Sequence, residues 1–168
     1  MIYILFSNNN NNNNNKGLKT VNIGKDTEYG INAILLVPIL AGFSMYNWNF
    51  YDVGRDLKTM SLITASLRET SSIILKKTKD QNNSMIKAIS FVPSILFASF
   101  LILFHFISLY IFSLDFEAFC NAHFNVKLGE QTDYWNNILS NDAEKYGIDI
   151  SNLKKLMKQY KESSKKNE

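Results

Sequence analysis

His105 is the side chain with the greatest potential for chemistry, because it lies near the middle of the uncharged segment Ala88–Leu114. Ionisable side chains in such segments are rare and usually face a neighbouring protein, a haem or a proton path. His105 is therefore a haem or quinone ligand, a group in proton or ion transport, or a neutral histidine bonded to a neighbouring helix. A lone histidine lacks a second haem ligand in this chain, so a haem would have to be shared with another subunit. We expect no cofactor, with His105 as the candidate residue if one binds.

Possible metal ligands follow this segment. Cys120 and His123 lie three residues apart, with Asp115 and Glu117 nearby. Two soft ligands do not complete a structural zinc site, so we predict no bound metal. The sequence also has no glycine-rich phosphate loop and no catalytic triad with supporting motif context. We therefore predict no catalytic residues and a protein that is not an enzyme.

Small and polar residues form one narrow stripe on the segment that contains His105. At 100° per residue, they project within about 80° of one another on an α-helix. Small residues let a second helix approach closely, and serine hydroxyls hydrogen-bond across such a contact. We therefore predict a helix-packing interface that also includes two residues of an earlier apolar segment. Its residues are Ser90, Ser94, Ala98, Leu101, His105, Ser108, Pro38 and Gly42.

Two uncharged segments are long enough to span a bilayer. Tyr29–Tyr51 has 23 residues and Ala88–Leu114 has 27. At 1.5 Å per residue, either crosses a hydrocarbon core of about 30 Å. The second is the stronger candidate, because asparagines and a proline weaken the first. Near the end of the first, Tyr46, Trp48 and Tyr51 are expected in an aromatic belt at the membrane interface.

These segments predict an all-α membrane protein with two transmembrane helices. The organisation is an Asn-rich disordered segment at 1–28, transmembrane helices at 29–51 and 88–114, a basic amphipathic loop or helix at 52–87, and a polar tail with short helices at 115–168.

The parts outside the predicted spans also have helical patterns. Between the spans, the residues on one apolar helical face are Leu57, Met60, Ile63, Leu67 and Ile74. This segment either rests on the membrane surface or extends the first helix and packs on a neighbour. In the tail, Thr132 and Ser151 are expected to begin two short helices, which Gly129 and Gly147 delimit.

The charges give two conflicting indications of orientation. Seven Lys or Arg residues lie between the spans and four near the membrane on the other side, which places the loop in the cytosol or the mitochondrial matrix. The last four residues, Lys165-Lys166-Asn167-Glu168, instead match an endoplasmic-reticulum retrieval signal that requires a cytosolic C-terminus. We expect a two-pass integral membrane protein, with the mitochondrial inner membrane ahead of the plasma membrane and the endoplasmic reticulum.

The net charge of +3 is small, and the lysines do not form a stripe interleaved with aromatic residues, so we expect no nucleic-acid partner. The pattern predicts a non-enzymatic accessory or regulatory subunit. Its transmembrane helices would pack on a larger membrane complex, such as a pump, a transporter, or a respiratory or ATP-synthase assembly. The expected partners are that complex and the lipid bilayer. Two alternatives stay open: a haem- or quinone-site membrane anchor that uses His105, and a membrane assembly factor retrieved to the endoplasmic reticulum.

Overall fold

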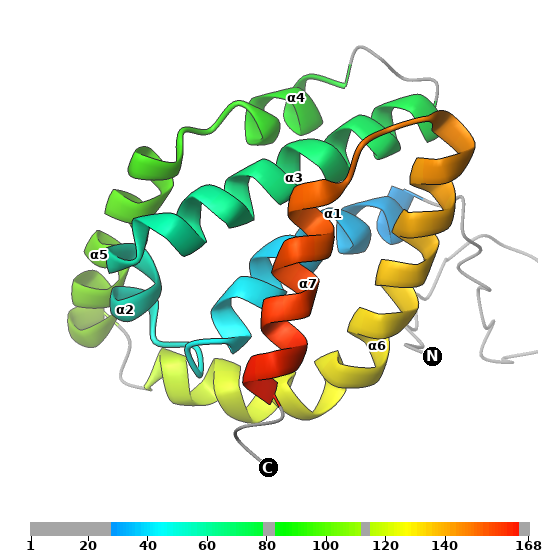
Figure 1. Cartoon of the computed structure of the whole chain (residues 1–168). Helices are drawn as coiled ribbons and strands as arrows, with labels where there is room; N and C mark the ends of the chain where they lie inside the picture. The colour runs from blue at the N-terminus through cyan, green and yellow to red at the C-terminus, as the bar shows by residue number, and fades with distance from the viewer. Residues whose placement is uncertain (1–27, 79–82, 112–114, 165–168) are drawn as a thin grey trace, which may run out of the picture.

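Helices make up most of the part of the chain that the computed structural model describes, which is residues 28–78, 83–111 and 115–164 (Figure 1). The Asn-rich run and the terminal Lys165-Lys166 pair lie outside these residues. No strand occurs within the described ranges, so the all-α prediction is confirmed there. The helices are α1 (Glu28–Ser44), α2 (Phe50–Arg55), α3 (Leu57–Thr78), α4 (Ser84–Ser90), α5 (Ser94–Ile111), α6 (Phe116–Tyr146) and α7 (Ser151–Ser164).

α3 is the central helix, because it contacts every other helix of the described part. Met60, Ile63 and Ile74 on its apolar face are at most 2% exposed, whereas Leu57 at its start is 54% exposed. The face predicted for this segment therefore packs on neighbouring helices and not on a membrane surface. α2 separates α3 from α1, so α3 does not extend the first helix.

α1 lies inside the bundle, where the sequence predicts the first transmembrane helix. Its almost fully buried residues are Ile34, Leu35, Val37 and Ala41, and the helix contacts α3, α6 and α7. α1 ends at Ser44, and a turn with positive φ at Asn47 and Trp48 leads into α2. The uncharged run 29–51 is therefore a buried core helix followed by a turn and a second short helix. A spanning helix at these residues is not confirmed, and the physical reason is that the apolar side chains of α1 are buried against protein.

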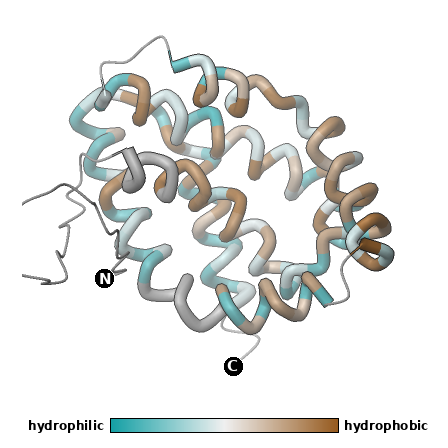
Figure 2. Tube along the Cα trace, turned by 180° about the vertical axis from the view of Figure 1, so that it is seen from behind, coloured by the Kyte–Doolittle hydropathy of each residue, from teal (hydrophilic) through white to brown (hydrophobic). Residues whose placement is uncertain are grey.

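The second predicted span is also interrupted. α4 ends at Ser90, and Pro93, which has no backbone N–H to donate, directly precedes α5. α5 lies at the edge of the bundle, packed on α2 and α3, and Figure 2 shows the strongly hydrophobic colour along it at the right-hand edge. Among the described residues, α5 is the one helix long and apolar enough to cross a membrane.

α6 is continuous through Gly129, so the helix break predicted there is wrong. Thr132, expected to begin a new helix, lies within α6 and is 3% exposed. Gly147 ends α6 in the left-handed conformation (φ 63°, ψ 41°), which glycine adopts without the steric cost of a side chain. The tail is therefore one long and one short helix that complete the bundle.

α7 begins at Ser151, as predicted, and buries one apolar face, which consists of Leu153, Leu156, Met157 and Tyr160. Glu69 of α3 holds the start of α7. Its two carboxylate oxygens accept hydrogen bonds from the backbone N–H groups of Asn152, at 3.1 Å, and Leu153, at 2.8 Å. These are among the N–H groups that have no partner inside the helix itself. An acidic side chain from another element thus caps α7.

Candidate functional site

The most unusual surface feature is a row of large apolar side chains that α5 leaves exposed. We call it the α5 apolar face, and it consists of Ile95, Leu96, Phe100, Leu103, Phe106, Ile107, Leu109, Tyr110 and Ile111, each between 39% and 89% exposed. No charged residue lies between Ser94 and Ile111. Contiguous exposed apolar surface of this kind marks a site that binds protein or membrane.

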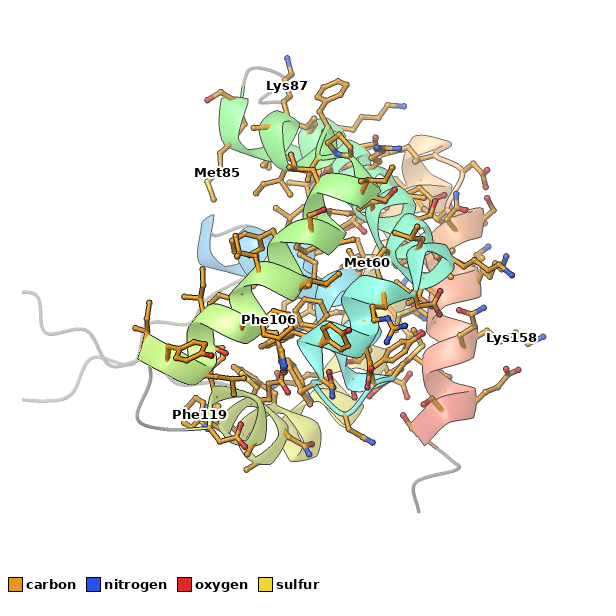
Figure 3. The ribbon with its side chains drawn as sticks, turned by 90° about the vertical axis from the view of Figure 1, so that its left-hand side faces the viewer. Met60, Met85, Lys87, Phe106, Phe119 and Lys158 are labelled. Atoms are coloured by element: carbon orange, nitrogen blue, oxygen red, sulfur yellow. The ribbon has the colours of Figure 1, made fainter. Side chains whose placement is uncertain are left out.

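Residues of two other helices extend this face. Met85 and Phe91 belong to the α4 region and are 62% and 76% exposed, and Phe119 of α6 is 45% exposed. Figure 3 shows this side of the molecule, with Phe106 near its centre and Met85 and Phe119 above and below it. The apolar surface therefore runs from α4 along α5 to the start of α6.

The opposite side of α5 packs on this chain's own α2 and α3. Ala98, Leu101 and Ser108 of the predicted small-polar stripe are 3–4% exposed. A Cβ atom at Gly54 of α2 would lie 2.8 Å from Cγ1 of Ile102 and 3.0 Å from the carbonyl oxygen of Ala98, so only glycine allows this close approach.

The other stripe residues lie at the edges of this contact. Ser90 and Ser94 are half-buried. In α1, Pro38 and Gly42 are buried, and a Cβ atom at Gly42 would overlap the side chain of Ile63 in α3. The predicted interface residues therefore contact helices of the same chain, and packing on a partner stays a prediction.

His105 joins α5 to α6 and α2 through Glu117. Its Nδ1 lies 2.7 Å from Oε1 of Glu117, in the first turn of α6. The same carboxylate oxygen accepts a hydrogen bond from the backbone N–H of Phe50, the first residue of α2, at 3.0 Å. Both side chains of the His–Glu pair are about one-fifth exposed. His105 therefore contacts a side chain of a neighbouring helix, and its Nε2 is the ring nitrogen not used in this bond.

The contact between His105 and Glu117 is not predicted from the sequence. Glu117 lies twelve residues further along the chain, and the signal was its position just after an apolar segment that contains an ionisable group. In the sequence, Glu117 lies beside the possible metal ligands Cys120 and His123. Within the described residues, no group of three or more His, Cys, Asp and Glu side chains could hold a metal ion.

Cys120 and His123 lie in different environments. Cys120 is 4% exposed, and burial, together with the negative charge of Glu117, raises the pKa of its thiol. A raised thiol pKa leaves little of the reactive thiolate at neutral pH. The His123 ring instead stacks on Phe119, with centroids 5.5 Å apart. Among the described residues, Cys120 therefore lacks the lowered pKa of a reactive thiol, and His123 contacts the rings of Phe119 and Phe124.

Of the three aromatic residues predicted for a membrane interface, Tyr46 and Trp48 lie in the connection between α1 and α2, and Tyr51 is the second residue of α2. Trp48 is 2% exposed and stacks on Phe124 at 5.2 Å, so it belongs to the protein core. The half-buried Tyr46 donates to Asp56 and lies 3.1 Å from Oγ1 of Thr59. Tyr51 lies against α5, with its ring 5.7 Å from that of Phe106. Tyr51 is therefore the one of the three that lies beside the α5 apolar face.

Asp56 links α2 to α3. Its Oδ1 accepts from the backbone N–H groups of Lys58 and Thr59 at the start of α3. The hydrogen bond from the Tyr46 hydroxyl is the main reason that the pKa of Asp56 is lowered, and burial opposes it. Burial and the nearby Asp56 raise the pKa of Tyr46 in turn. This cluster stabilises the turn that holds α2 against α5.

Comparison with known proteins identifies no relative, because no family model, curated protein or solved structure matches the chain.

Proposed function

We propose that this chain is a non-enzymatic, membrane-attached accessory protein, and that the α5 apolar face is its contact with the membrane. The observation that supports the proposal is the exposure of these side chains along the whole of an uncharged 18-residue helix. Removing a half-exposed Leu or Phe side chain from water yields roughly 1 kcal/mol. A row of such side chains therefore provides a driving force sufficient for stable attachment.

In the packed bundle, α5 is proposed to lie in the plane of the membrane interface. α2 runs along the middle of α5, because Gly54 meets Ala98 and Ile102 while the Phe50 ring lies 5.7 Å from that of Phe104. α2 carries the exposed charges Asp52 and Arg55. A spanning α5 would bring them to the membrane centre, at about 2.5–3.5 kcal/mol each.

An in-plane helix avoids this cost, because its apolar face enters the acyl boundary while the charged helices beside it stay at the headgroup level. This arrangement takes the place of the two-pass topology predicted from the sequence. It also explains why a long uncharged helix has a small-polar stripe on one side: that stripe packs on α2 and α3, and the remaining surface faces lipid.

The proposed partner is a larger integral membrane complex, for which this bundle would be a peripheral subunit held at the bilayer by α5. A respiratory or ATP-synthase assembly in the mitochondrial inner membrane is the proposed host, with a pump or transporter of another membrane as the alternative. Purification of the native protein in mild detergent, followed by mass spectrometry, tests this part. We expect stoichiometric co-migration with one large membrane complex, and migration alone would contradict a subunit role.

Membrane attachment is tested by placing a charge in the α5 apolar face. Leu103 is 58% exposed, so Leu103→Lys leaves the core intact while it puts an ammonium group at the centre of the face. Tyr134→Lys on α6 is the matched control, since Tyr134 is a large side chain exposed to 51%. We expect the first variant to move to the soluble fraction after cell fractionation and the second to stay with membranes. Equal fractionation of the two variants would contradict the proposal.

A second candidate function, the haem- or quinone-site anchor, has support from one observation. Glu117 binds Nδ1 of His105 at 2.7 Å, and a carboxylate on one ring nitrogen is the usual orienting contact for a histidine that ligates through the other. The test is an absorbance spectrum of the natively purified protein. A haem band that disappears in His105→Ala would support this function, and a full-length protein without such a band would rule out haem.

A further inference from the structure

We infer that the α5 apolar face binds membranes rich in anionic lipid, because basic side chains border it on α2, α3 and α4. This inference rests on the proposed membrane contact and adds the lipid class. Headgroup phosphates would be bound by Arg55, Arg68 and Lys87, each of which is exposed. Basic residues beside a membrane-bound apolar surface attract anionic headgroups. The arginine guanidinium forms two parallel hydrogen bonds to two oxygens of one phosphate.

Arg55 is placed beside the middle of α5 by a chain of ring contacts. Its guanidinium carbon lies 5.3 Å from the centre of the Tyr51 ring. That ring in turn lies 5.6 Å from His105 and 5.7 Å from Phe106 of α5. The guanidinium is therefore held next to the apolar face, while its N–H groups stay available to acceptors outside the protein.

Arg68 and Lys87 occupy the border near the beginning of α5. Nε of Arg68 donates to the carbonyl oxygen of Ser90, the last residue of α4, at 2.9 Å. Lys87 lies one turn earlier on α4, the helix that also carries the exposed Met85. In Figure 3, Met85 and Lys87 project from the same short helix at one end of the apolar surface. A cation and an apolar side chain therefore lie on one short helix at this end, with Lys87 pointing up and Met85 pointing down in this view.

Lysines near the end of α3, and Asp56 between α2 and α3, are bound within the protein. Lys77 is paired with Asp142 at 2.8 Å, and Lys76 donates to the carbonyl oxygen of Tyr146. Asp56 accepts from Tyr46 and from the start of α3. The exposed acids beside the same face are Asp52 of α2, next to Arg55, and Asp115, the N-cap of α6. The three exposed basic residues therefore exceed these two acids by one positive charge.

The exposed lysines of α7 provide a matched control, because they carry the same charge on another part of the surface. Lys154, Lys155 and Lys158 are exposed on the side of α7 opposite its buried face. Figure 3 shows Lys158 pointing away from the side that carries Phe106. General electrostatic attraction would involve these lysines as much as the border residues, whereas the inference assigns binding to the border.

The experiment measures binding of the full chain to vesicles of phosphatidylcholine alone and of phosphatidylcholine with phosphatidylglycerol. The test variant is Arg55→Gln with Lys87→Gln, and the control is Lys154→Gln with Lys155→Gln. Each basic residue near an anionic surface contributes about a 5-fold factor, so we expect roughly 30-fold weaker partitioning of the test variant into anionic vesicles. Its binding to neutral vesicles should not change, and the control should bind anionic vesicles nearly as the parent does.

A charge-retaining variant, Arg55→Lys with Lys87→Arg, separates the charge from any effect on folding and should restore most of the anionic binding. Equal binding of the parent to both vesicle types would overturn the lipid inference and leave membrane attachment standing. An equal loss in the control variant would also overturn it. Failure to bind either vesicle, combined with co-purification of a membrane protein, would overturn both the inference and direct lipid contact.

Discussion

Glu117 lies where α2, α5 and α6 meet, and this single side chain links the three helices. One of its oxygens accepts from Phe50 of α2 and also lies within hydrogen-bond distance of His105 of α5. Hydrogen bonds to charged groups contribute more than neutral ones, and an unsatisfied buried donor is costly. The position of α5 against the bundle therefore depends on a carboxylate outside that helix.

Glu117→Ala is predicted to lower the free energy of unfolding by about 1.5–3 kcal/mol, because both contacts are lost at once. Chemical denaturation followed by circular dichroism measures the change. Glu162→Ala is the control, since Glu162 is mostly exposed and its ion pair among the described residues is with the exposed Lys158, at 4.0 Å. If the two substitutions had the same small effect, Glu117 would not hold α5 in place.

Asp56 makes the stability dependent on pH. The Tyr46 hydroxyl lowers the pKa of Asp56 below the usual 3.8, so the folded state binds this proton less tightly than the unfolded state. The resulting stabilisation is present above pH 3.8 and is lost as the pH falls through the lowered pKa. Tyr46→Phe removes this hydroxyl. We predict that, as the pH is lowered from 5 to 2.5, the free energy of unfolding falls less in this variant than in the parent. Denaturation at a series of pH values tests this, and identical pH profiles would contradict it.

At the scale of the element, the sequence predicts helical faces well and helix environments less well. The buried faces of α3 and α7 and the stripe Ala98–Leu101–Ser108 follow from the helical spacing of apolar and small residues. The burial of α1 does not follow, because an uncharged run has the same composition in a protein core and in a membrane. The break between α4 and α5 lies at Pro93, inside the segment predicted as one span, and α6 is continuous through Gly129 although glycine weakens a helix.

The cap of α7 is an element-scale feature that no local pattern indicates, since Glu69 lies 83 residues before Asn152. Glu69→Ala is predicted to cost about 1–3 kcal/mol, because the first turn of α7 loses acceptors for its N–H groups and a favourable charge at its positive end. Hydrogen exchange should accelerate first in α7. Glu144→Ala, an exposed position on α6, serves as the control, and unchanged exchange in α7 would show that Glu69 does not cap it.

At the scale of the whole molecule, the apolar residues divide between a core around α3 and an outer face on α5. The sequence identifies the apolar segments but not this division, which depends on which helices surround each segment. The same holds for the candidate site: His105 and the stripe are visible in the sequence, whereas Glu117, Gly54 and the basic border acquire their roles only through folding. The resulting bundle is a charged body with one apolar side.

The most direct test of the proposed in-plane contact is the depth of spin labels along α5 in vesicles that contain anionic lipid. Labels at cysteines that replace Leu96, Leu103 and Tyr110, in a Cys120→Ala background checked by circular dichroism, lie seven residues apart and therefore share one helical face. We predict that all three are accessible to oxygen, shielded from a water-soluble nickel reagent and equally shallow, while a label at Lys158 stays in water. A label at position 103 deep in the bilayer, with the labels at 96 and 110 near opposite surfaces, would show a spanning helix. Three water-exposed labels would exclude membrane contact. Either result would contradict an in-plane contact of α5 with the membrane.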